Sequence, residues 1–180
     1  DALERLEKAI ALAREVGDRE REATALTVRA ISDHLKNNRD RAISDVAHHA
    51  AQGAVLGARG NCGMMLSHFL LGIAKSVEGR DRISTAEFAV ALSDGFDRLY
   101  ESLEEPVEGT ILTVMRDASA AARQAGTMDF VPLVTHVVEK ARESLARTPE
   151  QLAVLKKAGV VDAGAKGFVS MLEGVLMFVE

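Results

Sequence analysis

The sequence has one cysteine, no tryptophan and three prolines among its 180 residues, and aromatic residues make up only 4% of it. A single cysteine excludes an internal disulfide and any zinc site built from several cysteines, and it is typical of a reducing cytoplasm. With so few aromatic side chains, the core must consist of leucine, valine, isoleucine, alanine and methionine. We therefore expect a cytoplasmic protein with an aliphatic core.

The sequence also has no excess of basic residues, with 22 lysines and arginines against 27 acidic residues and a formal net charge of −5. The acidic net charge argues against nucleic acid as a partner, because affinity for nucleic acid comes from basic groups that neutralise phosphates. No apolar run approaches the ~18–20 residues of a membrane span, and no basic stretch precedes an apolar one at the start. We expect a soluble, intracellular protein without a membrane span.

Apolar residues make up 47% of the sequence and charged residues 27%, which is a globular balance. The length suits one domain with a core large enough to fold. We therefore expect residues 1–180 to form a single domain. The last segment is still apolar at Leu176 and Phe178, which is compatible with a fragment of a longer chain.

Apolar residues recur at steps of three and four along almost the whole chain, which is the spacing of amphipathic helices. Strand-like alternation is nowhere sustained. Short connections, roughly 4–8 residues, make successive helices antiparallel neighbours. The sequence therefore predicts an all-α, antiparallel up-and-down helical barrel or bundle of about eight helices. The expected helices cover, approximately, residues 3–16, 25–35, 44–55, 63–77, 85–105, 110–126, 129–145, 149–158 and 164–180.

Several helix boundaries carry local signals. Ser84 and Glu87 are spaced as a capping box, and Ser44 is a candidate N-cap. Gly126 is suited to end a helix. The dipeptide Thr148-Pro149 reads as an N-cap followed by a first-turn proline, which would open a short new helix.

Glycine is concentrated just before three of the expected helices, in residues 57–63 (GARGNCG), 108–110 (EGT) and 161–167 (VDAGAKG). Glycine-rich backbone that leads into a helix start suits phosphate binding, because N–H groups and the positive end of the helix dipole point at the ligand. Each loop taken alone is equally compatible with a simple tight turn. The pattern is neither a Walker A motif nor a dinucleotide fingerprint.

Topology favours a joint role for these loops. In an antiparallel bundle the helices that begin near residues 63 and 110 start at the same end. The segment 149–158 is short, about 15 Å as a helix, and would lie across that end. The helix that begins near residue 164 would then start there too, so we expect the three glycine loops to converge on one mouth.

The same three segments resemble a known family. Residues 57–63 are similar to the Gly-Ala-Arg-Gly-Asn-Ser-Gly segment of the nucleotide-binding (DhaL-type) domain shared by dihydroxyacetone kinases and bacterial fatty acid kinases. Residues 106–114 (PVEGTILTV) and 158–164 (AGVVDAG) resemble its second and third signatures, in the same order. The likeness covers roughly residues 24–180. It is greater to the fatty acid kinases, which occur beside or fused to a DegV-type fatty-acid-binding protein.

The resemblance implies an eight-helix antiparallel barrel that binds ATP at one end and transfers its γ-phosphate to an acceptor. It implies that the first glycine loop cradles the phosphates, that the second borders the adenine and that the third closes the pocket. The implied nucleotide-binding residues are Gly60, Asn61, Cys62, Gly63, Gly109, Thr110, Leu112, Asp162 and Gly164. Arg59 is the best candidate for a cation that neutralises the phosphate charge. The alternative is that its side chain forms a salt bridge or lies in a solvated turn.

Two departures from the family pattern bear on activity. Cys62 stands where the family has serine, which replaces a good hydroxyl donor by a weak thiol donor. The family's Asp-Gly-Asp-Thr-Gly-Thr-Asn loop, whose aspartates hold Mg²⁺, has no counterpart in residues 17–25 (GDREREATA). Asp18 and Glu20 are weak candidates for metal ligands, with a solvated charged turn as the other interpretation. Either the metal site is lost or a loop is omitted.

Several functional interpretations stay open. As a kinase, the protein would phosphorylate a fatty acid carboxylate presented by a DegV-type carrier or fused domain, or else dihydroxyacetone. A catalytically impaired nucleotide-binding module and a partner-binding helical module are the alternatives. A homodimer is compatible with each of them.

Overall fold

The computed structural model describes residues 42–180, and this part of the chain is helical with no strand. The all-α prediction is confirmed there, while the helices expected over residues 3–16 and 25–35 lie outside the described residues. None of the helices within residues 42–180 is long and apolar enough to cross a bilayer. The helices are α3 (Ile43–Gly57), α4 (Gly60–Ser76), α5 (Thr85–Glu101), α6 (Ile111–Gln124), α7 (Phe130–Gln151), α8 (Ala153–Ala158) and α9 (Ala163–Val179).

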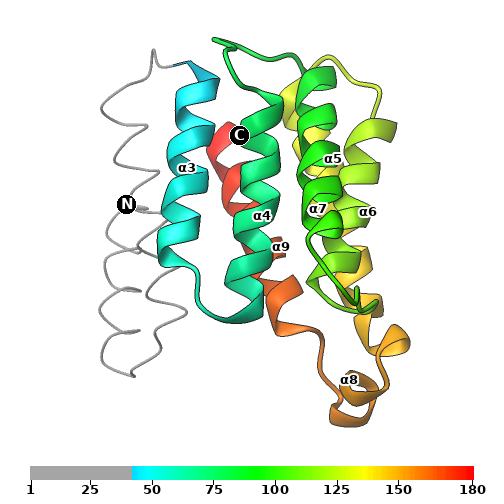
Figure 1. The fold of residues 1–180 in the computed structure, drawn as a ribbon. Coiled ribbons are helices and arrows are strands. Elements are labelled where there is room, and N and C mark those ends of the chain that lie inside the picture. Colours follow the sequence, from blue (N-terminus) through cyan, green and yellow to red (C-terminus); the bar gives the residue numbers. More distant parts are fainter. Residues whose placement is uncertain (1–41) are drawn as a thin grey trace, which may run out of the picture. The chain divides into compact units, whose positions relative to one another are not determined.

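The described residues fall into two compact units, residues 42–82 and residues 83–180. In the first unit, α3 and α4 lie side by side and run in opposite directions, joined by Ala58 and Arg59 (Figure 1). Closure of the helices into a barrel and a single domain over residues 1–180 stay predictions.

The start of α3 differs from the sequence prediction. Ser44 was expected to be the N-cap, but the N-cap is Ala42 and Ser44 lies in the first turn. The segment after α4 provides the cap through its backbone, because the carbonyls of Asp81 and Arg80 accept the N–H groups of Ile43 and Ser44 at 3.1 and 3.2 Å. The Ser44 hydroxyl accepts the N–H of Gly79 at 3.0 Å, so it holds the returning segment and caps nothing.

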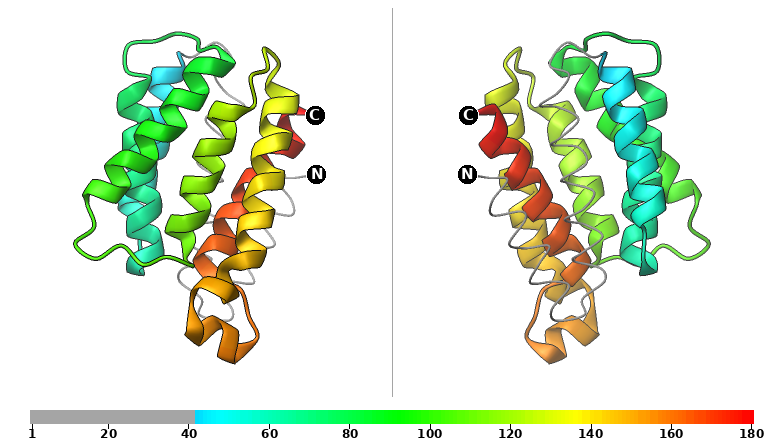
Figure 2. Two further views of the ribbon diagram at one scale, coloured as in Figure 1. Left: turned by 90° about the vertical axis from the view of Figure 1, so that its right-hand side faces the viewer. Right: turned by 90° about the vertical axis from the view of Figure 1, so that its left-hand side faces the viewer.

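In the second unit, α5, α6, α7 and α9 run side by side, and α8 extends beyond the end where α7 stops and α9 begins (Figure 2). α6 packs against α5, α7 and α9, and nine of its fourteen residues are buried. This helix is therefore the centre of the unit. Its fully covered side chains Leu112, Val114 and Met115 are apolar and non-aromatic, as expected from the composition, and Thr113 is a polar residue among them.

Most helix boundaries of the second unit agree with the local signals. The capping box at α5 is present in full, with Ser84 accepting the N–H of Glu87 and Glu87 accepting the N–H of Ser84. Asp129 caps α7, and Gly126, just beyond the end of α6, has a positive φ of 57°. The end of α8 is also confirmed, because Gly159 is its left-handed C-cap.

The prediction at Thr148-Pro149 is wrong. α7 does not stop before these residues but continues to Gln151 with Pro149 inside its last turn, and α8 starts only at Ala153 after Leu152. Proline lacks the N–H that would bond to the carbonyl four residues earlier. The Thr148 hydroxyl donates to that carbonyl, Leu145 O, at 2.8 Å. The helix can therefore pass through the proline.

Candidate functional site

The first glycine loop, in the first unit, is a tight connection between two helices. Only Ala58 and Arg59 separate the end of α3 from Gly60, the first residue of α4, whose φ is +63°. Gly63 lies so close to this connection that an added Cβ would be 3.0 Å from the Cα of Ala58. The sequence thus places glycine where α4 must begin sharply and press against the chain that precedes it.

The start of α4 is exposed. Asn61 and Cys62 are exposed in its first turn, and Arg59, the N-cap residue, makes no side-chain capping bond within the described part of the chain. The Arg59 guanidinium turns onto its own loop, where Nη1 donates to the carbonyl of Ala58 at 2.7 Å and to that of Leu56 at 3.4 Å. A seventeen-residue helix therefore presents its positive end, with a cation beside it, at the surface.

The second signature precedes α6 in the second unit. Thr110 is the N-cap of α6: its hydroxyl accepts the N–H of Leu112 at 3.3 Å and donates to the carbonyl of Val107 at 2.7 Å. The side chain of Leu112 is only 1% exposed and belongs to the core. Leu112 therefore supports this loop from the core, while the hydrogen bonds of Thr110 fix the conformation of its backbone.

Gly109 is locked into the same loop. Its φ is +78°, which favours glycine, and its N–H donates to the Thr113 hydroxyl at 2.9 Å. A Cβ at this position would lie 2.9 Å from the Cβ of Leu152, 3.0 Å from that of Gln151 and 3.1 Å from the Leu152 nitrogen. The loop thus lies directly against the end of α7.

Glu108 anchors the outer side of this loop. Its carboxylate accepts the Thr113 hydroxyl and Arg116 Nη1, each at 2.6 Å. The hydrogen bond from Thr113 lowers the pKa of Glu108 below its ordinary value, slight burial opposes this, and Arg116 lowers it further. Glu108 is therefore a carboxylate at neutral pH, and one oxygen is paired with a guanidinium.

The third signature begins α9. Asp162 is its N-cap, and Oδ1 accepts the N–H of Ala165 at 2.7 Å. The N–H of Asp162 donates to the Thr148 hydroxyl at 3.1 Å. Gly164 is half-buried in the first turn. This helix start is fixed both by its own aspartate and by a threonine from α7.

The second and third signatures therefore lie at the same end of the second unit, and both contact the end of α7. The first signature lies in the other unit, so the convergence of all three loops stays a prediction. Thr113 and Thr148 belong to the site, and no motif in the sequence identifies them as site residues. The only signal for Thr148 was the following proline, and it was interpreted as a helix start.

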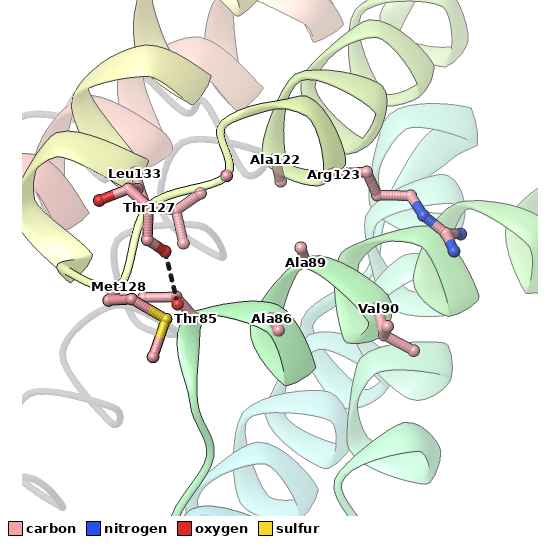
Figure 3. Close-up of a pocket in the computed structure, with 10 residues that line it drawn as sticks. Thr85, Ala86, Ala89, Val90, Ala122, Arg123, Thr127, Met128 and Leu133 are labelled. Carbon is pink, nitrogen blue, oxygen red and sulfur yellow. Dashed lines mark hydrogen bonds between the residues drawn. The ribbon is translucent and has the colours of Figure 1, made fainter.

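A shallow pocket of about 300 Å³ lies at the opposite end of this unit, between the start of α5 and the connection from α6 to α7 (Figure 3). It contains none of the predicted site residues. Alanine side chains and Met128 form much of its lining, the Thr85 hydroxyl is already bonded to the carbonyl of Thr127 at 2.7 Å, and Arg123 points away. It offers few polar groups to orient a ligand.

The described residues contain no group of three or more histidine, cysteine or acidic residues placed to hold a metal ion. The two weak metal candidates, Asp18 and Glu20, lie outside the described residues. A magnesium site therefore stays a prediction that rests on those two residues.

Comparison with known proteins gives the same family as the signatures. The profile of the DAK2 domain matches residues 21–177. An uncharacterized protein of Staphylococcus epidermidis is 42% identical over 153 residues, and one of Staphylococcus aureus strain USA300 is 39% identical over 153 residues. Each alignment covers 84% of this chain and 28% of the relative, so the chain spans less than a third of these proteins. The match over most of its length shows that the chain belongs to the DAK2 domain family.

Proposed function

We propose that this protein is the ATP-binding domain of a kinase that transfers the γ-phosphate of ATP to a small acceptor. DAK2 domains are nucleotide-binding, kinase-related modules, which supports the nucleotide and the class of reaction. The proposed acceptor is a fatty acid carboxylate held by a DegV-type carrier protein or fused domain. Dihydroxyacetone is the alternative acceptor.

The observation that carries the nucleotide proposal is the start of α4. Its first turn is exposed, it follows a loop in which glycine permits the sharp entry, and Arg59 stands beside it. The first N–H groups of a helix have no partner within the helix, and with the helix dipole they attract phosphate. We assign phosphate binding to Gly60, Asn61, Cys62 and Gly63, with Arg59 supplying charge.

The second unit supports the same proposal independently. Gly109 and Thr110 form a rigid loop, and Asp162 and Gly164 begin α9 beside it at the same end. Backbone groups held in this way can bind a nucleotide without rearranging. We assign Gly109, Thr110, Asp162 and Gly164 to this role, with Leu112 supporting the loop from the core.

The proposal that the acceptor arrives on a carrier is supported by the pocket of the second unit. That pocket is shallow, has a volume of about 300 Å³ and lies at the end away from Gly109 and Asp162. Its shape and position therefore do not suit the binding of a long acyl chain close to a phosphoryl donor. The proposal includes a homodimer.

A charge placed at the start of α4 tests the proposal. Asn61→Asp adds a carboxylate where the helix dipole favours it but where it would repel phosphate. At an effective dielectric constant of about 20, like charges about 4 Å apart repel by ~4 kcal/mol, so the affinity for ATP should fall at least tenfold. Ala86→Asp is the matched control, because Ala86 is exposed in the first turn of α5 and lies in no signature.

Binding is measured by calorimetric titration of ATP with Mg²⁺ into the protein and the two variants, with circular dichroism to check folding. Equal affinity in the protein and both variants contradicts phosphate binding at α4. No binding to the unmodified protein contradicts the whole proposal and favours a partner-binding helical module.

Turnover is measured separately, with a fatty-acid-loaded carrier and with dihydroxyacetone. ATP binding without turnover of either acceptor identifies a catalytically impaired nucleotide-binding module. If Asp18 supplies a magnesium ligand, Asp18→Ala abolishes magnesium-dependent turnover and leaves the helical content unchanged.

A further inference from the structure

Thr148 has two hydrogen bonds that point in different directions. Its side chain is 0% exposed at the end of α7. The hydroxyl donates to the carbonyl of Leu145 at 2.8 Å and accepts the N–H of Asp162 at 3.1 Å. It therefore joins the end of one helix to the start of another, fourteen residues later in the chain.

Pro149 determines to which group the Thr148 hydroxyl donates its proton. In a continuous helix the N–H of residue 149 would donate to Leu145, but proline has none. The Thr148 hydroxyl provides the missing donor and commits its proton to the helix. Its oxygen is then left as an acceptor, and the backbone N–H of Asp162 fills that role. Thr148 and Pro149 thus link the end of α7 to residues 159–162, the loop that precedes α9 (the α9 loop).

The same end of α7 also meets the second signature loop. Gly109 lies against Gln151 and Leu152, within four residues of Thr148. Gly109 is tied in turn to the buried hydroxyl of Thr113, which is 0% exposed. The segment 148–152 therefore contacts both loops, and its position sets the separation between them.

We propose that Thr148 is a positioning residue for the nucleotide-binding loops of the second unit, an inference that rests on the proposed ATP binding. Thr148 holds the backbone of Asp162 so that its carboxylate caps α9 while the loop stays at a fixed distance from Gly109. Its exposed surface is nil, so it acts through Asp162 and touches no ligand.

Three variants test this role. Thr148→Val keeps the side-chain shape and removes both hydrogen bonds, which leaves the partly buried N–H of Asp162 without its acceptor. Thr148→Ser retains the hydroxyl. Thr135→Val is the matched control, because Thr135 lies in the same helix and its hydroxyl makes an equivalent bond to the carbonyl of Val131 at 2.8 Å, far from both loops.

Two readouts separate positioning from general stability. We expect Thr148→Val to speed amide hydrogen exchange in residues 160–166 and to weaken ATP binding about tenfold, the effect of one lost buried hydrogen bond. Thr148→Ser should restore both values, and Thr135→Val should change neither. If Thr148→Val fails to fold, Thr148→Cys replaces it, because a thiol of similar size is a weaker donor and acceptor.

The outcomes distinguish this inference from the proposed function. Unchanged exchange in residues 160–166 of Thr148→Val overturns the positioning role, as does unchanged ATP affinity in a protein that binds ATP. An equal loss of affinity in Thr135→Val also overturns it, because the effect would then be general. If the unmodified protein binds no ATP, the proposed function fails, and faster exchange in Thr148→Val still supports the fastening of the α9 loop.

Discussion

Replacing Gly109 by alanine should damage the second unit far more than a surface loop substitution normally does. Two separate costs arise at this position. The residue has a φ of +78°, and a Cβ would lie within 2.9–3.1 Å of Leu152 and Gln151. One of those neighbours is the backbone nitrogen of Leu152, which cannot rotate away as the end of a flexible side chain can.

The structure allows the two costs to be separated. Gly159 has a similar φ of +67° but has nothing within 4 Å of an added Cβ. Gly159→Ala therefore carries only the left-handed backbone cost, roughly 1–2 kcal/mol. Gly109→Ala carries that cost and an overpacking cost of roughly 1–3 kcal/mol, so we expect a loss of about 2–5 kcal/mol in the free energy of unfolding.

Urea unfolding followed by far-ultraviolet circular dichroism measures both variants against the unmodified protein. The slope with urea should stay constant if each variant changes stability alone. Equal destabilisation by Gly109→Ala and Gly159→Ala would refute the close approach of the loop to α7. A loss below about 0.5 kcal/mol for Gly109→Ala, the usual range of surface substitutions, would refute both arguments.

Two further substitutions test other parts of the second unit. Ser84→Ala removes the capping box at α5 and should lower the free energy of unfolding by about 1 kcal/mol, measured by urea unfolding; no loss would contradict the cap. Glu108→Gln should flatten the acid limb of stability against pH. Thr113 and Arg116 lower the pKa of Glu108 in the folded state, so its stabilisation is complete above the unfolded pKa, about 4.3, and is lost as the pH falls through the folded value. An acid limb of unchanged slope in Glu108→Gln would contradict that contribution.

The sequence predicted those helix boundaries whose signals are local. At Ser84 and Gly126 the residue that acts and the backbone it acts on lie within a few positions of each other. Their energies depend little on distant parts of the chain, so spacing alone identifies them. The all-α class was predictable for a similar reason, because helical periodicity persists from one segment to the next.

The predictions at Ser44 and Thr148 were wrong because neither hydroxyl caps a helix that follows it: each accepts an N–H that is distant in the sequence, and Thr148 also donates to Leu145 within α7. Ser44 accepts an N–H from Gly79, thirty-five residues later, and Thr148 accepts one from Asp162. Serine and threonine at a helix start or before proline resemble N-caps whenever only their neighbours are considered. The acceptor or donor to which they bond depends on the tertiary structure, which the neighbouring residues in the sequence do not reveal.

In the candidate site, too, the motifs predict the loops but not the buried side chains that hold them in place. The signatures identify the loops, including Gly109 and Asp162, but the groups that fix the backbone N–H of each are buried threonines on α6 and α7. Thr113 lies in the run ILTVM, all five residues of which are buried. A hydroxyl in such a run must find a partner, because a buried polar group without one is costly. Thr113 finds its partners outside its own helix, because its hydroxyl accepts the N–H of Gly109 and donates to Glu108, and this fastens the loop to α6.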